Sequence, residues 1–382
     1  MRKVLYLAWI GFNNLGDEWM WEMFKAMADA HLSEDEYVVI PSLPKEEWKK
    51  VSQYDTIVLG GGSLIVPGYV DLVHDALELG KTIVIWGSGH DRLHQWAPSQ
   101  DGQLKPEKAV ESPAYRQKLK AIMEQSAYCA VRGPWTLDYL ASLDALPKHI
   151  AMSGDPAMLM NAPMPASALQ PASPASQPEA ASQAESASQP ASPLQPADNV
   201  QGQVRTIGIN WGTTYNRLYG GSEERVEDQL ADTCRSLLRL GYRLHLYSVW
   251  GPDQEALARL YRKLGQDERI TFDPKVHAAA EYVRLMSGFE ATINFKLHAN
   301  LLSAAANVPF VCIGYRFKGF DLMHGLDLAD WIVPADDPRL AEKLTEKVQA
   351  AAAWRDGYIG KLEAGREAAY QALVTPFRKR LF

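Results

Sequence analysis

Short runs of apolar residues alternate along the chain with longer stretches in which apolar side chains recur every three to four positions. The short runs predict strands, and the periodic stretches predict amphipathic helices. Strands that alternate with helices favour a parallel sheet with helices on both faces. The whole pattern occurs twice, before and after a segment of quite different composition.

The first half begins with an expected strand and ends near residue 162. The expected strands are Val4–Ile10, Tyr37–Ile40, Thr56–Leu59, Thr82–Trp86, Tyr128–Val131 and His149–Met152. The expected helices are Asp17–Leu32, Val70–Leu79 and Tyr115–Gln125, with another beginning near Trp135. In the first of these helices Met20, Met23, Phe24 and Met27 fall on one face, which indicates packing against a core.

The second half repeats the alternation. Its expected strands are Thr206–Asn210, Arg243–Tyr247, Ile270–Phe272, Ala291–Asn294 and Phe310–Gly314. Its expected helices are Glu224–Leu240, Gln254–Leu264, Val276–Met286, His298–Ala306, Arg339–Trp354 and a terminal helix, Tyr358–Leu373. The chain is therefore predicted to be an α/β protein with two Rossmann-like, doubly wound domains. They would face each other across a cleft, the layout of a GT-B type transferase.

Between the halves, residues from Pro163 to Asp198 are mostly Ala, Ser, Pro and Gln, with no aromatic or β-branched side chain. Such a segment cannot bury enough apolar surface to offset the entropy of ordering. We predict a first domain over 1–162, a disordered linker over 163–203 and a second domain over 204–382. A Pro-rich partner-binding tract is the alternative, but no Pro-x-x-Pro pattern with basic flanks occurs.

Charge and cysteine content narrow the function. Acidic residues number 46 against 39 Lys plus Arg in 382 residues, a net charge of −7, which argues against nucleic-acid binding but allows a local basic pocket. Cys129, Cys234 and Cys312 are far apart and odd in number, so neither a disulfide framework nor a metal site is expected. Cys129 and Cys312 lie in apolar runs and are expected to be buried thiols.

The N-terminal apolar run, Val4–Ile10, fits a first strand better than a signal peptide, because it is short and acidic residues follow it. No later stretch approaches the roughly 20 apolar residues of a membrane span. We therefore expect a cytoplasmic protein. The basic run Arg378–Arg380 is too small to anchor the chain alone, so we expect at most peripheral contact with the inner face of the plasma membrane.

The loop after the first strand, Gly11–Glu18, joins that strand to a helix and offers backbone N–H groups to a ligand. Its spacing is neither Gly-x-Gly-x-x-Gly nor a P-loop. Acidic residues at the helix start disfavour phosphate there, whereas Asn14, Asp17 and Glu18 suit sugar hydroxyls. Alternatively, Asp17 is simply the N-cap of the helix.

Other strand ends in the first half also carry candidate residues. Gly61, Gly62 and Ser63 follow the third strand, where consecutive glycines allow a ligand to approach the backbone or merely form a tight turn. Arg132 ends another strand and could hold a carboxylate or phosphate, or be a solvated surface side chain. His90 is expected to be a solvated loop residue, and Asp155 part of a turn before Pro156.

The most informative cluster lies late in the chain. Lys296 and His298 follow one expected strand, and Arg316 and Lys318 follow the next. Because these groups repel one another when charged, the cluster favours an anion site over solvated surface positions.

Taken together, these motifs resemble the polysaccharide pyruvyl transferase family. The resemblance rests on Gly11–Glu18, Gly60–Leu64, Val131–Arg132, Gly154–Pro156, Ile207–Asn210, Lys296–Ala299 and Val308–Lys318. Two positions depart from the family pattern: Lys296 replaces an arginine, and Trp211 stands where arginine is frequent, with Arg217 the nearest substitute. Lysine lacks the bidentate geometry of arginine, so donor handling could differ.

The resemblance implies transfer of a pyruvyl group from phosphoenolpyruvate to two hydroxyls of a sugar in a cell-surface or secondary cell-wall polysaccharide precursor. His298 would be the general acid or a hydrogen-bond donor to the phosphate. Lys296, Arg132, Arg316, Lys318 and Arg217 would bind the donor; Asn14, Asp17, Glu18, Gly61, Gly62 and Ser63 would bind the acceptor, for which a lipid-linked sugar is one candidate. No cofactor or metal is implied, because phosphoenolpyruvate is a co-substrate.

Two other functions stay open. One is a nucleotide-sugar glycosyltransferase on the same fold, which would need a well-placed carboxylate in the second domain to recognise a ribose. The other is a non-catalytic member of the family, which the departures at Lys296 and Trp211 would suit. A Rossmann dehydrogenase is disfavoured, since the dinucleotide fingerprint is missing.

Overall fold

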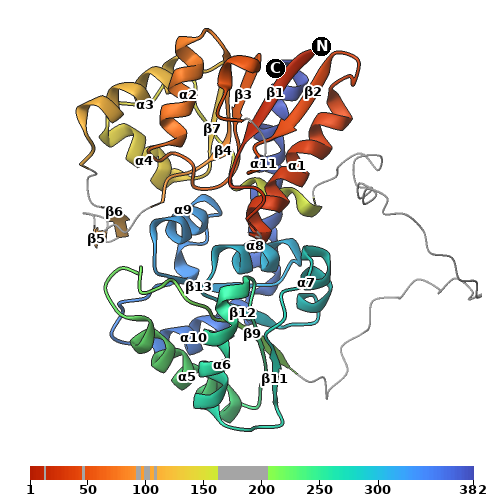
Figure 1. Ribbon diagram of the computed structural model, residues 1–382. Coiled ribbons are helices and arrows are strands. Elements are labelled where there is room, and N and C mark those ends of the chain that lie inside the picture. The colour runs from red at the N-terminus through yellow and green to blue at the C-terminus, as the bar shows by residue number, and fades with distance from the viewer. Residues whose placement is uncertain (13, 45–47, 92–95, 99–103, 107–109, 162–204) are drawn as a thin grey trace, which may run out of the picture.

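The computed structural model describes residues 1–12, 14–44, 48–91, 96–98, 104–106, 110–161 and 205–382, and these form two halves stacked one above the other (Figure 1). The predicted linker lies outside the described residues, as do the points where the two domains were expected to meet it. The linker and its partner-binding alternative therefore stay predictions.

The upper half in Figure 1 contains a parallel sheet in the order β2-β1-β3-β4-β7-β8. Its strands are β1 (Arg2–Leu7), β2 (Tyr37–Pro41), β3 (Thr56–Leu59), β4 (Thr82–Ser88), β7 (Tyr128–Val131) and β8 (Ala151–Met152). Its helices are α1 (Leu15–His31), α2 (Tyr69–Glu78), α3 (Pro113–Gln125) and α4 (Pro134–Ser142). A small antiparallel pair, β5 (Trp96–Pro98) and β6 (Leu104–Pro106), lies outside this sheet.

The lower half contains a second parallel sheet in the order β11-β10-β9-β12-β13-β14. Its strands are β9 (Thr206–Asn210), β10 (Arg243–Tyr247), β11 (Ile270–Asp273), β12 (Ala291–Asn294), β13 (Phe310–Gly314) and β14 (Ile332–Pro334). The helices after β9 are α5 (Glu223–Arg239), α6 (Gln254–Leu264), α7 (Ala279–Met286), α8 (Leu297–Ala305), α9 (Phe317–Gly325), α10 (Leu340–Ala353) and α11 (Arg355–Arg378). The prediction of two Rossmann-like, doubly wound sheets is confirmed.

Two elements of the lower half were not expected from the sequence. Strand β14 has three residues and ends in Pro334, so it is too short to show a periodicity. Helix α9 includes Gly319 and ends at Gly325, and glycine lowers helix propensity. Both elements are stabilised by packing against β13. Phe320 of α9 and Ile332 of β14 both lie directly beside Gly314 and occupy the space that a side chain there would need.

The first strand ends earlier than the apolar run predicts. Residues Val4 to Leu7 are fully buried, as expected for a central strand covered on both faces. At Ala8, however, the backbone N–H and carbonyl both bond to the hydroxyl of Ser42, at 2.9 and 2.8 Å. The backbone groups of Ala8 therefore form their hydrogen bonds with a side chain and not with a neighbouring strand. The chain leaves the sheet at this point and forms the loop before α1.

Each sheet has one point where successive strands are added on opposite sides. In the upper sheet β2 and β3 flank β1, and in the lower sheet β10 and β12 flank β9. The connections diverge at such a point and leave a crevice at the carboxyl ends of the strands, where ligands bind in doubly wound folds. The loops that follow β1, β3, β9 and β12 carry most of the residues that the sequence predicts to be functional.

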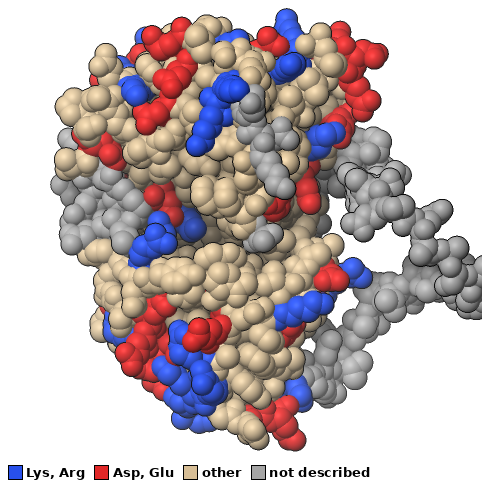
Figure 2. Space-filling view, viewed as in Figure 1, with Lys and Arg blue, Asp and Glu red and all other residues tan. Residues whose placement is uncertain are grey.

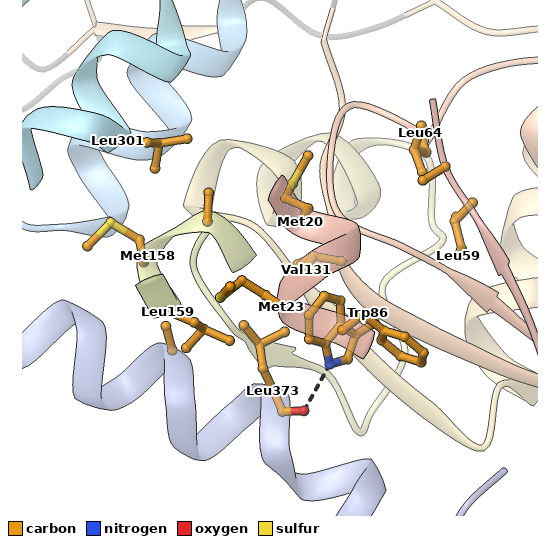
Figure 3. Packing of buried hydrophobic residues seen from close by; sticks show 14 of the residues in the cluster. Met20, Met23, Leu59, Leu64, Trp86, Val131, Met158, Leu159, Leu301 and Leu373 are labelled. Carbon is orange, nitrogen blue, oxygen red and sulfur yellow. Dashed lines mark hydrogen bonds between the residues drawn. The ribbon is translucent and has the colours of Figure 1, made fainter. Parts of the chain in front are cut away.

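The last helix joins the two halves. Helix α11 begins in the lower half and reaches the upper sheet, where the indole N–H of Trp86 donates to the Leu373 carbonyl at 2.9 Å (Figure 3). The Tyr128 hydroxyl donates to the Ala372 carbonyl at 2.6 Å. Thus the range 204–382, predicted as the second domain, includes a helix whose C-terminal part packs on the first.

The apolar core also crosses between the halves. Leu301 of α8 belongs to the same buried cluster as Met20 and Met23 of α1 and Met158 (Figure 3). All three cysteines are buried free thiols, which confirms the expectation for Cys129 and Cys312. In the described ranges no helix combines the length and the apolar character required to cross a membrane. The basic run near the C-terminus reaches the first half, where Arg380 pairs with Glu36 at 2.8 Å.

Candidate functional site

Two cavities adjoin at the junction of the halves, and Figure 2 shows Lys or Arg side chains beside Asp or Glu side chains there. The lower chamber, of about 190 Å³, is lined mainly by the second half, and the upper chamber, of about 610 Å³, mainly by the first. Both chambers share Asn14, Arg217, Leu297, His298, Arg316 and Lys318. The structure therefore brings together most of the predicted donor and acceptor residues.

The cations stand at two helix N-termini. Lys296 is the N-cap of α8 and His298 lies in its first turn, while Arg316 and Lys318 hold the same places in α9. Neither first turn contains an acidic residue, in contrast to α1 and α5. A helix N-terminus carries partial positive charge and normally attracts acidic groups. Adding cations there is unfavourable without an anion, so this wall is suited to a multiply charged anionic ligand.

Lys296 is held in place by its own domain. Its ammonium group pairs with Asp253 at 3.0 Å, donates to the Thr213 carbonyl and lies 5.0 Å from the centre of the Trp250 ring. Burial lowers the pKa of Lys296, and Asp253 opposes that shift. A side chain on Gly212 would overlap Asp253, so glycine is required beside this pair. The lysine that replaces the family arginine is thus a fixed cation at the floor of the lower chamber.

Arg316 and Lys318 face an acidic residue that the sequence analysis did not single out. Asp91, after β4, pairs through Oδ2 with Arg316 at 3.0 Å and lies 3.9 Å from Lys318. Its Oδ1 and the Nε of Arg316 are buried, and neither atom has a hydrogen-bond partner among the described residues. Asp91 therefore places a carboxylate against the cations that an anionic ligand would contact. Its sequence signal is its place after Gly87–His90, at a strand end.

His90 is not the solvated residue that was expected. It is buried, its ring stacks on Tyr139 at 3.7 Å between centres, and its Nδ1 lies 2.8 Å from the Ile65 carbonyl. It supports the loop before Asp91 and does not line either chamber.

His298 meets the start of α1 across the junction. A side chain on Gly16 would come within 1.9 Å of the His298 Nε2, so only glycine allows α1 to begin against this ring. Burial, followed by the nearby charges of Lys318, Lys296 and Arg132, lowers the pKa of His298 to about 3. The imidazole is neutral at pH 7 in this state. A neutral imidazole has one ring N–H to donate in a hydrogen bond and no additional proton to release, so this pKa favours the predicted role of hydrogen-bond donor over that of general acid.

Asp17 is another acidic residue that the upper half contributes to the chamber shared with these cations. The N-cap of α1 is Asn14, whose amide donates to the Asp17 carboxylate, so the alternative that Asp17 is the N-cap is wrong. Gly62 lies directly beside Asp17: a Cβ added to this glycine would be 3.0 Å from Asp17 Oδ1. The φ angle of Gly62, +104°, also favours glycine at this position. Burial, Asp155 and Glu18 raise the pKa of Asp17 to about 7, while Lys318 and Arg132 oppose the shift.

Asp155, expected as a turn residue, lines the upper chamber near Asp17. Its Oδ1 does accept the Ala157 backbone N–H at 3.0 Å, as in a turn, but burial raises its pKa. It is a second buried carboxyl group on the floor of this chamber.

Two predicted acceptor residues line neither chamber. Glu18 accepts the Gly11 backbone N–H at 2.6 Å, which fixes the loop before α1. Gly61 donates its N–H to the Tyr6 hydroxyl at 3.1 Å and packs against Met20. These residues shape the loops, whereas Gly62 and Ser63 reach the upper chamber as expected.

Arg132 is completely buried, so the solvated alternative is wrong. Its guanidinium donates to Asp321 of the second half at 3.3 Å, to the His90 carbonyl at 2.9 Å and to the Ser63 hydroxyl at 3.3 Å. Asp321 also accepts the backbone N–H and the hydroxyl of Thr136. Arg132 borders the upper chamber, but its hydrogen bonds fix the two halves relative to each other.

The loop after β9 carries Arg217, which is exposed and borders both chambers. Tyr215 and Asn216 adopt positive φ angles of 55°, and Glu223 accepts the N–H groups of Thr214 and Asn216. Trp211 is fully buried and its indole donates to Glu227, so it cannot contact a ligand. Arg217 is therefore placed where it can take over the role of the absent arginine.

The chain matches a family model described as polysaccharide pyruvyl transferase over residues 14–316. The matched range begins at Asn14, the N-cap of α1, includes the glycines after β3 and the α8 N-terminus, and ends at Arg316. No curated protein matches the chain in sequence.

Several solved structures share the fold at low sequence identity. A UDP co-structure of MnaA from S. aureus has a TM-score of 0.54 and 11% identity, covering 100% of this chain and 98% of that one. A putative UDP-N-acetylglucosamine 2-epimerase from Listeria monocytogenes gives 0.57 and 10%, covering 97% and 93%. The UDP-GlcNAc 2-epimerase of Methanocaldococcus jannaschii, in complex with UDP-GlcNAc and UDP, gives 0.56 and 10%, covering 99% and 100%. These similarities confirm the predicted two-domain GT-B architecture.

Proposed function

The chain belongs to the polysaccharide pyruvyl transferase family, and we propose that it transfers a pyruvyl group from phosphoenolpyruvate to two hydroxyls of one sugar. The product would be a cyclic ketal on a cell-surface or secondary cell-wall polysaccharide precursor, and the leaving group would be inorganic phosphate. The observation that carries the proposal is the convergence of two helix N-termini with Lys296, Arg316 and Lys318 on one chamber wall.

Phosphoenolpyruvate has a carboxylate and a phosphate, and this wall suits both. Arg316 and Lys318 would bind one anionic group at the start of α9, in place of Asp91. Lys296 and the exposed Arg217 would bind the other from the lower chamber. Neutral His298, in the first turn of α8, lines both chambers and can donate a hydrogen bond to a phosphate oxygen. We expect neither a metal nor a cofactor to take part.

Asp17 is suited to the proton transfers. With a pKa near 7, it can deliver a proton to the methylene carbon of phosphoenolpyruvate. The first hydroxyl then adds to C2, and its proton returns to the Asp17 carboxylate. When the C2–O bond to phosphate breaks, the second hydroxyl adds to C2 and closes the ketal. The proton of this hydroxyl leaves with phosphate through His298, whose pKa the anionic donor would raise.

A nucleotide-sugar glycosyltransferase receives less support from the side chains. In the second half, the carboxylates of Glu223 and Asp253 contact the lining residues Thr213 and Lys296, but neither lines the lower chamber. Glu223 is occupied by hydrogen bonds from Thr213, Thr214 and Asn216, and Asp253 by Lys296. The rival function would require one of them to release its partners and bind a ribose.

The deciding experiment is phosphate release from phosphoenolpyruvate by the purified protein, with lipid-mimetic sugar acceptors, for wild type and His298→Ala. We expect release that depends on the acceptor and is lost in the variant. No release with any acceptor would contradict the proposal. Thermal stabilisation by a nucleotide sugar but not by phosphoenolpyruvate would then favour the glycosyltransferase, and stabilisation by phosphoenolpyruvate without turnover would favour a non-catalytic binding protein.

A further inference from the structure

Two aromatic side chains in the loop after β1 are unusually exposed. Trp9 and Phe12 are each 46% exposed, although the tryptophans Trp19, Trp86, Trp135 and Trp211 are almost completely buried. Their rings stack on each other, with centres 4.1 Å apart and planes 18° from parallel. Exposed aromatic surface is costly, and stacking fixes the orientation of the Trp9 ring without hiding it. An exposed ring held in one orientation is suited to contact a flat ligand.

Trp9 borders the upper chamber, and its neighbours there are polar. Asp17, Ser63 and Asp155 line the same cavity, as does Tyr69 at the start of α2. Asp17 raises the pKa of Tyr69, after the larger effect of burial, so the two side chains lie close together. The chamber thus combines an aromatic ring with carboxyl and hydroxyl groups. A pyranose has the matching surface: C–H groups on its face and hydroxyls around its edge.

We propose that Trp9, supported by Phe12, is the stacking platform for the acceptor sugar, whose hydroxyls then point toward Asp17. This inference rests on the function proposed above and adds the acceptor subsite. The face of an indole ring is negative and the C–H face of a pyranose is weakly positive, so the two attract each other. Stacking fixes the plane of the sugar, and two hydroxyls on its edge can then approach one carbon of the donor.

Insertion of the two rings into a membrane is the other use of exposed aromatics. The charge around Trp9 disfavours it, because Asp17, Asp91 and Asp155 line the same chamber and would repel anionic lipid headgroups. Among the cations of this chamber, Arg316 and Lys318 face Asp91, and Arg132 donates a hydrogen bond to Asp321. A sugar, which is uncharged and rich in hydroxyls, fits these surroundings better.

The test is steady-state phosphate release at varied concentrations of methyl β-D-glucopyranoside and methyl β-D-galactopyranoside, in the full chain. The variants are Trp9→Ala, Phe12→Ala and Trp9→Tyr. Trp354→Ala is the matched control, since Trp354 is 42% exposed and also stacked, on Trp331 in the second half. We expect Trp9→Ala to raise the KM for the sugar about five- to ten-fold. Trp9→Tyr, which keeps an aromatic ring, should have a sugar KM close to that of the wild type. The KM for phosphoenolpyruvate should stay within about two-fold of the wild-type value in each variant.

The outcomes separate this inference from the proposed function. Wild type that releases no phosphate with any sugar contradicts the function itself. Wild type that is active, with an unchanged sugar KM in Trp9→Ala, overturns only the platform. Co-sedimentation with vesicles of 30% anionic lipid, lost in Trp9→Ala while the sugar KM stays unchanged, would assign the rings to a membrane instead. Thermal melting of each variant, compared with Trp354→Ala, excludes misfolding as the cause of a raised KM.

Discussion

The two halves of the molecule share a plan but differ in what their helix starts present. In the upper half, α1 begins with Asp17 and Glu18, which is the favourable arrangement for a helix N-terminus. In the lower half, α8 and α9 begin instead with Lys296, Arg316 and Lys318, whose charges oppose the helix dipoles, and with the neutral His298. The strand order of each sheet creates a crevice, whereas the side chains at the helix N-termini decide whether that crevice suits an anionic or an uncharged ligand. On this basis we propose that the donor binds to the lower half and the acceptor to the upper half.

The strand orders differ as well. The lower sheet follows the order 3-2-1-4-5-6 of dinucleotide-binding domains, and the upper sheet follows 2-1-3-4 and continues through β7 and β8. Both orders place their crevice beside the first strand of the half. Two glycines of the upper half allow close contact with the lower half, because a side chain at either position would overlap a residue there. Gly16 lies against His298, and Gly133 lies against Asp321. The two crevices can therefore meet closely although their sheets are built differently.

Removal of the acid from the upper half should have the largest effect. We expect Asp17→Asn to reduce kcat about a thousand-fold, because the amide cannot transfer the proton. Binding of phosphoenolpyruvate, measured by titration calorimetry, should change little, since the cations of the lower half remain. Asp29→Asn is the control on the same helix, where Asp29 is an exposed partner of Lys25. Loss of donor binding in Asp17→Asn but not in Asp29→Asn would contradict the division between the halves.

Adding a methyl group at the contact between the two halves, by a substitution at Gly16, should have the next largest effect on activity. Gly16→Ala would place its Cβ within 1.9 Å of the His298 ring. We expect a roughly hundred-fold loss of kcat/KM, because a displacement of about 1 Å is enough for that. Gly360→Ala in α11 is the control: no atom lies within 4 Å of its added Cβ. It should keep full activity and slightly raise the melting temperature. Full activity in Gly16→Ala would show that this contact does not position His298.

In the lower half, loss of one cation should weaken donor binding. We expect Lys318→Met to raise the Kd for phosphoenolpyruvate about ten- to a hundred-fold, as for the loss of a hydrogen bond to a charged group. The measurement is calorimetric titration, with Lys361→Met as the control because that surface lysine pairs with Asp327. An unchanged Kd in Lys318→Met would place the donor elsewhere.

The pH dependence tests which form of Asp17 is active. Its pKa is raised to about 7, so the protonated form predominates below that pH and is lost above it. If this form donates the proton, kcat/KM for phosphoenolpyruvate should be level below about pH 6 and fall about ten-fold per unit well above pH 7. A profile that rises from pH 6 to pH 8 would instead show that the carboxylate is the active form.

Asp91, which belongs to the upper half but faces the cations of the lower one, should give the smallest effect. Because its carboxylate pairs with Arg316 at 3.0 Å, it competes with an anionic ligand. We expect Asp91→Asn to tighten binding of inorganic phosphate about two- to five-fold. Weaker binding in this variant would mean that Asp91 orients Arg316 for the ligand and does not compete with it.

The two sheets and the neighbouring positions of the cationic residues could be predicted from the pattern of residues along the chain. Apolar runs such as Tyr128–Val131 and Phe310–Gly314 match the observed strands because a strand buried on both faces is a nearly continuous run of apolar residues. Since parallel strands end at one edge of a sheet, the order along the chain also predicts that Lys296 and Arg316 are neighbours. Short elements such as β14 were missed because three residues carry no period.

The contacts that each of these side chains makes could be seen only in the folded structure. Arg132 was expected to bind the donor, yet its hydrogen bonds connect the two halves, because Asp321 lies 189 positions later in the chain and is brought beside it by folding. The importance of Asp91 likewise depends on Arg316 of the opposite half. The neutral state of His298 depends mainly on its burial, since burial is the largest cause of its lowered pKa. Local sequence encodes elements and strand ends, whereas burial and pairing across the cleft arise from residues far apart along the chain.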